Sequence, residues 1–223
     1  MGVNRAGFGI VDDAVVRQAA TQEIIRRYFR YACEYKLGFM EKDTVERLEI
    51  LMENLHVKPE NRRVVEPARQ AAAGAQVEGK GREGFFCGAA IELEDGVIVT
   101  GQNSPLLHAS SSLILNAAKR LAGIPDHLHL LPPAITDSLR HLKKDILDGK
   151  EVSLDVEETL IALSISAASN PVAEMAIEKL RELRACEIHL THIPTPGDEA
   201  GLRKLGVNVT SDPEFASRSL FIH

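Results

Sequence analysis

The chain has 223 residues, 44% of them hydrophobic, which is enough for one large domain or for a domain with an appendage. A net charge of -6, a pI near 5.8 and the absence of Trp argue against a protein that binds the nucleic-acid backbone, because such proteins concentrate Lys and Arg. No apolar run approaches the roughly 18 residues that cross a bilayer, and the three cysteines lie far apart, so we expect a cytoplasmic protein with reduced thiols and with no nucleic-acid or membrane partner.

Two helices are predicted at the start of the chain. Asp12 and Asp13 are predicted to cap the first helix, which ends at Gly38. Its broad apolar face includes Val15 and Val16. Asp43 is predicted to cap the second helix, with Glu46 three residues later as in a capping box. We expect the two helices to form an antiparallel hairpin.

A domain boundary is predicted in the polar, proline-broken stretch 58–63. It separates a helical hairpin subdomain, residues 1–60, from a main subdomain, residues 61–223. The main subdomain is expected to open with a helix at Glu66-Pro67, because proline is tolerated in the first helical turn.

A β-hairpin followed directly by a helix forms the centre of the main subdomain. Residues 85–93 and 97–100 suit strands, and Asp95-Gly96 between them suits a tight turn. Apolar residues then recur with helical spacing from Ile114, and Gly123 stands where the helix would end.

Helices and strands alternate through the rest of the chain. We predict strands at 127–131, 187–193 and 207–210, and helices at 135–147, 154–168, 171–183 and 198–205. The helix at 154–168 is mostly apolar, so we expect it to be buried. Because strands separated by helices pair in parallel, the fold class is α/β, with a layered sheet that has one antiparallel hairpin at its beginning.

This order of elements, together with the hairpin sequence GAAIELEDGVIVTGQN, resembles the cytidine deaminase fold. The resemblance implies a three-layer mixed sheet behind the N-terminal helical hairpin. Deaminases hold zinc with an H-x-E or C-x-E motif and a P-C-x-x-C motif. Here the first motif falls at His108-Ala109-Ser110 or at Ile114-Leu115-Asn116, neither of which contains a glutamate, and Val172 and Met175 replace the two cysteines. Valine cannot bind zinc and a thioether binds it poorly, so we expect no metal and no other cofactor.

A closer resemblance covers nearly the whole chain. MGVNRAGFGIVDDAVVRQAATQEIIRRYF, SSSLILNAAKRLAGIPD, ETLIALSISAASNP and RKLGVNVT are similar to the C-terminal half of the bacterial family called domain of unknown function 1846. The resemblance implies that the family's N-terminal half is missing. The partner is then expected to be a separate chain equivalent to that half, or further copies of this chain in a homo-oligomer.

The deaminase resemblance also implies a shallow pocket where the helix after the hairpin meets the helix that opens at Asn170-Pro171. Helix N-termini carry free N–H groups that bind anions or carbonyls. The polar candidates are Asn103, Ser104, His108, Ser110, Ser111, Asn170 and Glu174. The simpler interpretation makes the serines capping or packing residues, His108 a surface histidine and Glu174 a solvated glutamate.

Two functional hypotheses follow. The first is a metal-free, deaminase-like domain that serves as a binding or assembly module. The alternative is a metal-independent enzyme that acts on a small nucleotide-like or acidic substrate, with His108, Asn170 and Glu174 as polar participants.

Overall fold

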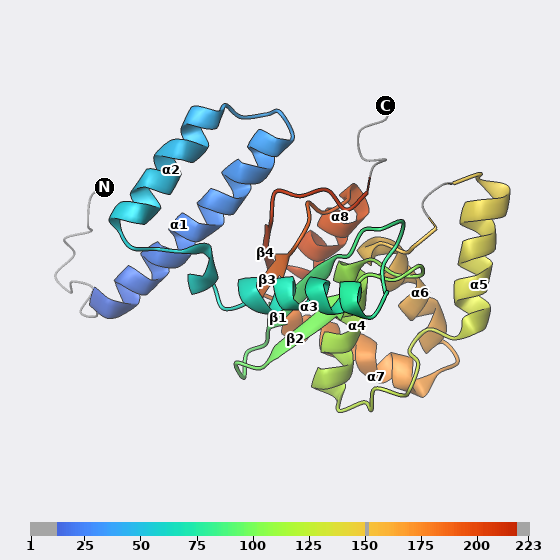
Figure 1. Cartoon of the computed structure of the whole chain (residues 1–223). Coiled ribbons are helices and arrows are strands. Elements are labelled where there is room, and N and C mark those ends of the chain that lie inside the picture. Colours follow the sequence, from blue (N-terminus) through green and yellow to red (C-terminus); the bar gives the residue numbers. More distant parts are fainter. Residues whose placement is uncertain (1–12, 150–151, 218–223) are drawn as a thin grey trace. The chain divides into compact units, whose positions relative to one another are not determined.

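The computed structural model describes residues 13–149 and 152–217, and the chain divides into two compact units, Met1–Arg62 and Arg63–His223 (Figure 1). We call them the hairpin unit and the sheet unit. Within the described residues there are eight α-helices and four strands, so the fold is mixed α/β, as predicted. In this part of the chain, no helix combines the length and the apolar character that crossing a membrane requires.

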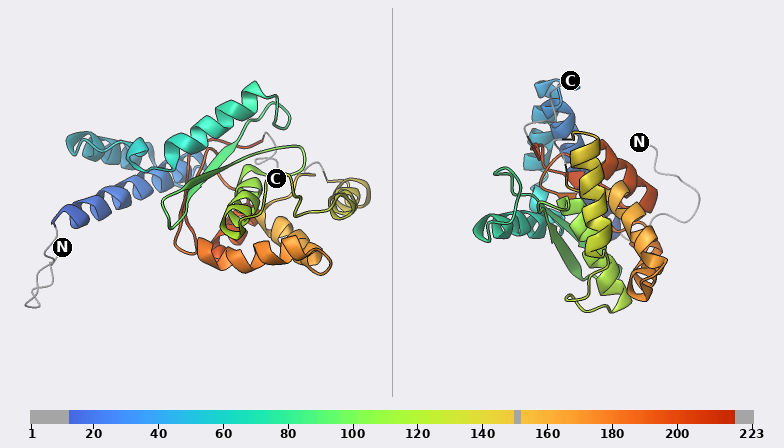
Figure 2. Two further views of the ribbon diagram at one scale, coloured as in Figure 1. Left: turned by 90° about the horizontal axis from the view of Figure 1, so that it is seen from below. Right: turned by 90° about the vertical axis from the view of Figure 1, so that its right-hand side faces the viewer.

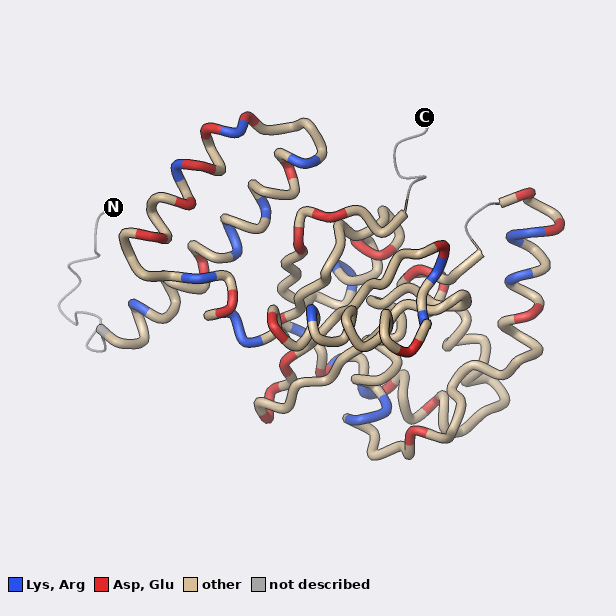
Figure 3. Tube along the Cα trace, in the orientation of Figure 1, with Lys and Arg blue, Asp and Glu red and all other residues tan. Residues whose placement is uncertain are grey.

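The hairpin unit contains α1 (Asp13–Lys36), α2 (Lys42–Asn54) and the short 3-10 helix η1 (Pro59–Asn61). Helices α1 and α2 pack against each other, and Gly38, with φ 80°, ends the first as predicted. Basic and acidic residues are interspersed along both helices (Figure 3). The buried apolar side chains are Ile25, Phe29 and Ala32 of α1 and Val45, Leu48 and Met52 of α2.

Two predictions for this unit are wrong in detail. Val15 and Val16, expected on the apolar face of α1, are exposed. Asp43 is not the cap of α2, because the N-cap is Glu41, two residues earlier, and Glu46 forms an ion pair with Lys42 at 2.7 Å in place of a capping-box contact. Asp12, expected to cap α1, lies outside the described residues.

The sheet unit is built on four strands in the order β2-β1-β3-β4. Strand β1 (Gly88–Glu92) pairs antiparallel with both β2 (Ile98–Gln102) and β3 (Glu187–Leu190), whereas β3 pairs in parallel with β4 (Asn208–Ser211). The predicted hairpin is therefore present, with Gly96 at φ 77° in its turn. The sheet is mixed, because β1 runs against both of its neighbours.

Helices cover both faces of this sheet. Helix α3 (Val65–Val77) lies on one face and α4 (Ala109–Ala122) on the other, as both views in Figure 2 show. Each approach is close because a glycine stands below the helix: a Cβ atom at Gly88 would overlap the backbone of α3, and one at Gly101 would overlap the backbone of α4. Gly123, with φ 64°, ends α4 as predicted.

Four further helices follow α4 in the chain. They are α5 (Pro133–His141), α6 (Val156–Ala167), α7 (Pro171–Lys179) and α8 (Pro196–Leu205), with the π-helical turn η2 (Leu142–Ile146) after α5 and the 3-10 turn η3 (Leu180–Leu183) after α7. Helix α6 contacts α7 and α8, and α4 contacts α7. Ala89, Ile91, Leu113, Ile114, Ile188 and Leu190 are among the residues that form the main core between the sheet and α4.

The predicted strand at 127–131 is wrong. These residues form a turn between Pro125 and Pro132, and only Leu130 of the five is buried. Without a neighbouring strand, an extended segment there would leave its backbone groups unpaired, so a short apolar run between prolines was not sufficient evidence for a strand. Helix α6, expected to be buried, leaves Ile161 and Ile165 exposed.

Candidate functional site

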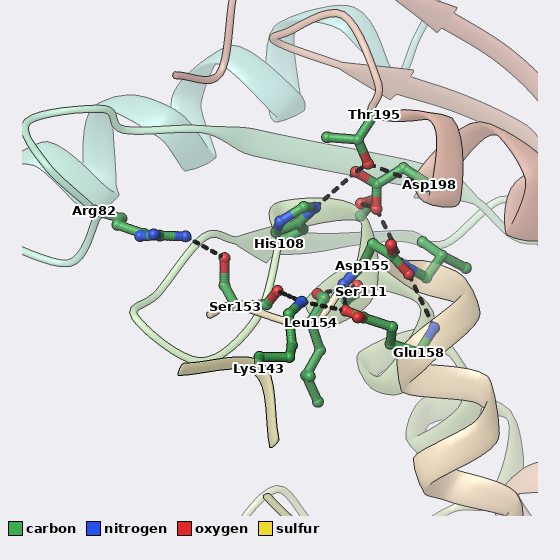
Figure 4. A network of polar contacts seen from close by, with 12 residues as sticks. Arg82, His108, Ser111, Lys143, Ser153, Leu154, Asp155, Glu158, Thr195 and Asp198 are labelled. Atoms are coloured by element: carbon green, nitrogen blue, oxygen red, sulfur yellow. Dashed lines mark hydrogen bonds and ion pairs between the residues drawn. The ribbon is translucent and has the colours of Figure 1, made fainter. Parts of the chain in front are cut away.

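A buried carboxylate, Asp198 in the first turn of α8, is the centre of a polar network in the sheet unit (Figure 4). Its side chain has no exposed surface. Asp198 accepts hydrogen bonds from the Nδ1 atom of His108 at 2.7 Å, the hydroxyl of Ser110 at 2.7 Å, the hydroxyl of Thr195 at 2.8 Å and the backbone amide of Val156 at 3.1 Å.

The partners of Asp198 come from three helix N-termini. His108 and Thr195 are the N-cap residues of α4 and α8, and Val156 is the first residue of α6. Burial alone raises the pKa of the Asp198 carboxyl group, but the hydrogen bonds from His108, Ser110 and Thr195 outweigh it and lower the pKa to about 2. The carboxylate is therefore ionised at neutral pH, where the positive ends of the helices also favour it.

An ionised carboxylate can only accept hydrogen bonds, so the proton of the neutral His108 ring lies on Nδ1 and Nε2 is its basic nitrogen. The His108 side chain is 15% exposed. The His108 ring therefore contacts the buried carboxylate of Asp198 on one side and solvent on another.

His108 lines a small hollow of about 40 Å³. Its walls come from the segment before β1, from the start of α4, and from the segments that follow β3 and β4. The lining residues include Arg82, Cys87, Asn103, Ser104, His108, Ala109, Ser153, His192 and Thr195. One water needs roughly 10–15 Å³ by the same measure, so the hollow has room for only a small polar group.

His192 lies in the wall of the hollow and is 2% exposed. Burial lowers the pKa of its imidazole to about 4, so the ring is neutral at physiological pH. Within the described part of the chain, its Nδ1 atom has no hydrogen-bond partner. A buried polar atom in this state is uncommon in native proteins and points to a ligand or water at that position.

Polar contacts also hold the outer wall of the hollow. Arg82 donates from Nη1 to the hydroxyl of Ser153 at 3.1 Å, and Lys143 donates to the Ser153 carbonyl oxygen and to Glu158 (Figure 4). Asp155 and Glu158 form a capping box at the start of α6. These contacts fix the segment that precedes α6 against the site.

Cys87 is the one thiol among the lining residues that the structure describes, and it is not activated. Burial raises the pKa of this thiol to about 12, with a smaller contribution from the Asp198 charge. Since the thiolate is the nucleophilic form of cysteine, Cys87 is a packing residue here.

Comparison with known proteins places the chain in a family. The model of the family described as "Domain of unknown function DUF1846, C-terminal" matches residues 60–221. The chain belongs to this family. The model of the DUF1846 N-terminal domain matches residues 1–56. The expectation that the chain corresponds to the C-terminal half alone is therefore wrong, because the helical hairpin falls in the match to the N-terminal domain, and a missing N-terminal half has no support.

The similar curated proteins carry only the name UPF0371 protein. One from Clostridium botulinum strain Langeland is 48% identical over 222 residues, and those from Clostridium tetani and Clostridioides difficile are each 47% identical over 221 residues. Each match covers 99% of this chain and 44% of the relative. The chain thus spans less than half the length of these relatives.

In this DUF1846 chain, the residues predicted to line one pocket lie in two regions of the structure, near the start of α4 and at the start of α7. Asn103, Ser104 and His108 line the hollow, and Ser110 lies beneath it on Asp198. Ser111 is buried and donates to the carbonyl oxygen of Leu154 at 2.9 Å. These five residues are near one another at the start of α4.

Asn170 and Glu174 are not among the residues that line the hollow. The side chain of Asn170 caps α7 by accepting a hydrogen bond from the amide of Val172 at 3.0 Å. Glu174 is exposed in the first turn of α7. Among the described residues, no three His, Cys, Asp or Glu side chains gather as a metal site.

Sequence reasoning missed Asp198, His192, Thr195 and Arg82. Thr195 and Asp198 have the spacing of a capping box, and Thr195 does accept a hydrogen bond from the Asp198 amide at 3.3 Å. That local signal could have identified a capped helix. The contact of Asp198 with His108, ninety positions away, depends on how α4 and α8 pack and has no local signature.

Proposed function

We propose that the sheet unit carries an acid–base site for a small acidic substrate, in which His108 transfers the proton and Asp198 orients it. The observation that carries the proposal is the 2.7 Å contact between His108 Nδ1 and a carboxylate with no exposed surface. Such a partner fixes the tautomer of the histidine and stabilises the imidazolium that forms when Nε2 takes a proton. The proposal assigns no step to a metal.

The position of His108 supports a chemical role over a purely structural one. Ser110, Thr195 and Val156 already satisfy Asp198, and all three are inside the network. His108 adds a partly exposed ring at the wall of a hollow that also contains a buried histidine, His192. General acid–base groups need this combination of a fixed orientation and access to substrate.

The experiment begins with a thermal-shift screen of small carboxylic acids, sugar phosphates and nucleotides, because a ligand of the folded state raises Tm by mass action. Compounds that bind are then incubated with the wild-type chain, with His108→Gln and with the control His127→Gln, which changes an exposed histidine. We expect turnover to fall about 10²–10⁴-fold in the first variant only. Equal turnover by wild type and His108→Gln would exclude the proposed role of His108.

We also propose that the sheet unit is a deaminase-like fold that does not use the zinc position. The succession α3, β1–β2 hairpin and α4, followed after α5, α6 and α7 by β3, α8 and β4, supports this, as do Val172 and Met175 in α7. Leu107 and Val172, in the two segments that bear the metal motifs in deaminases, pack against the same apolar cluster, which also supports the proposal. Zinc bound at one equivalent after dialysis would contradict this assignment.

The alternative function is a binding or assembly module, in which a second copy of the chain docks on the first to form a homo-oligomer. Self-association in light scattering, combined with no ligand in the screen, would favour it over the enzyme.

A further inference from the structure

We propose that the hollow binds a carboxylate group of the ligand, between the N-terminus of α4 and the ring of His192. This inference rests on the proposed function, because it names the class of substrate presented to His108. Two independent features support it, and both belong to residues that line the hollow.

The first feature is the open N-terminus of α4, a helix of 14 residues. Its N-cap residue is His108, and within the described residues this side chain makes no capping hydrogen bond to α4, since its Nδ1 atom is engaged with Asp198. The first helical residue, Ala109, lines the hollow. Uncapped N–H groups and the helix dipole favour a bound anion at this position.

The second feature is His192, which follows β3 and lines the same hollow. It is 2% exposed, and its Nδ1 atom has no partner among the residues that the structure describes. A neutral imidazole with its proton on Nδ1 donates one hydrogen bond, which a carboxylate oxygen can accept. The ligand would therefore satisfy a polar atom that the protein leaves without a partner.

The charges around the hollow are consistent with an anion. Arg82 contributes a cation to the wall. Its guanidinium donates a hydrogen bond to Ser153 and forms an ion pair with Glu83 at 3.6 Å. Asp198 lies beneath and would repel an anion, but four donors already surround its carboxylate. Among the described residues that line the hollow, Glu83 is therefore the one carboxylate, and it is paired with Arg82.

The size of the hollow limits the group that can enter it. Its volume of about 40 Å³ is room for roughly three water-sized groups, which admits a carboxylate, and the two oxygens of a carboxylate match one donor from α4 and one from His192. With the carboxylate there, the rest of a small acid would lie at the mouth, where His108 is exposed. The substrate class is therefore a small carboxylic acid with a transferable proton near its carboxylate.

The test is an NMR titration of the full, ¹⁵N-labelled chain with acetate, lactate and, separately, inorganic phosphate. We expect saturable shifts of the Ala109 amide and of the His192 ring with both carboxylates, in the millimolar range expected of such small ligands. His192→Leu should weaken the binding about tenfold or more, whereas the matched control His127→Leu should leave it unchanged.

A second variant tests the helix end without changing a polar side chain. Ala109→Pro removes the first amide of α4, and the extended backbone of His108, with φ -65° and ψ 159°, accepts a following proline. Its helix content is checked by circular dichroism, and a folded variant should lose the carboxylate response.

The outcomes separate this inference from the proposed function. Non-saturable shifts, unchanged affinity in folded His192→Leu, or phosphate binding as tight as that of lactate would overturn the carboxylate site. Binding that persists in His108→Gln supports the carboxylate site, because His108 is not one of its ligands. Loss of turnover in that variant is the independent test of His108 in proton transfer.

Discussion

A single side chain, Asp198, connects three helices of the sheet unit through one charge. Its four hydrogen bonds replace the water that a carboxylate would otherwise bind. Replacing Asp198 by an asparagine of the same shape should therefore lower the free energy of unfolding. His108 and Thr195 would then face an NH₂ group, which cannot accept their hydrogen bonds.

We expect Asp198→Asn to lower the free energy of unfolding by about 2–4 kcal/mol. The measurement is urea denaturation followed by circular dichroism, with Asp95→Asn, a change in the exposed hairpin turn, as the control. A loss below about 0.5 kcal/mol, the usual size for surface positions, would contradict the structural account of this network.

His192 makes stability depend on pH. The pKa of its imidazole is about 4 in the folded chain, compared with an ordinary value of 6.5, which applies to the unfolded chain. As the pH falls, the unfolded chain therefore takes up the proton first. Stability is therefore full above pH 6.5 and declines as the pH falls from 6.5 through 4, by about 3 kcal/mol. Asp198 and Asp212, each with a pKa of about 2, add a further loss below pH 3.8.

Urea denaturation at pH 7.5, 6, 5 and 4 measures this dependence. His192→Leu should flatten the decline between pH 6.5 and 4, whereas the exposed control His127→Leu should leave it unchanged. An identical decline in wild type and His192→Leu would show that other groups cause it.

At the scale of helices and strands, two glycines of the same sheet unit have different physical roles. A Cβ atom at Gly101 would overlap backbone atoms of Leu113 and Ala109, whereas one at Gly123 would meet nothing within 4 Å. Gly123 instead has φ 64°, where a non-glycine residue is strained by about 1 kcal/mol. Gly101→Ala must move α4 away from β2, so we expect it to cost about 3 kcal/mol, clearly more than Gly123→Ala. Thermal unfolding of both variants tests the order, and equal losses would contradict the close approach of α4 to the sheet.

Elements with local signals were predictable from the sequence. Gly38 and Gly123 marked helix ends, and Asp95-Gly96 marked the hairpin turn, because each depends on backbone conformations that a few residue types prefer. Residues 127–131 were mistaken for a strand, since an apolar run does not reveal whether a neighbouring strand exists. Asp43 was mistaken for the cap because two helix starts two residues apart, at Glu41 and Asp43, look alike in sequence.

The candidate site was predictable only on the α4 side. Asn103, Ser104 and His108 precede α4 and line the hollow, so their sequence position alone brought them together. Asp198 and His192 come from segments that reach the hollow through the packing of α8 and β3, which no local pattern encodes. Their buried polar atoms became informative only when their partners, or the lack of one at His192 Nδ1 among the described residues, were known.

At the scale of the whole molecule, the two units differ in how much they bury. The hairpin unit buries few apolar side chains between its two α-helices, whereas the sheet unit has a core that involves the sheet, α4, α6 and α8. Small helical pairs are marginal on their own, and local stability follows buried apolar contact. We therefore expect amide hydrogens of α1 and α2 to exchange with solvent faster than those of β1, β3 and α4.

Hydrogen exchange with mass spectrometry measures this difference. The same measurement on the Asp198→Asn variant tests whether the two units exchange independently. Because Asp198 connects α4, α6 and α8, the variant should speed exchange at the starts of these helices and leave α1 and α2 unchanged. Exchange that rises equally in both units would mean that they unfold as one cooperative body, in contrast to the division of contacts at residues 62 and 63. Faster exchange confined to α4, α6 and α8 would support Asp198 as the group that holds the three helix N-termini together.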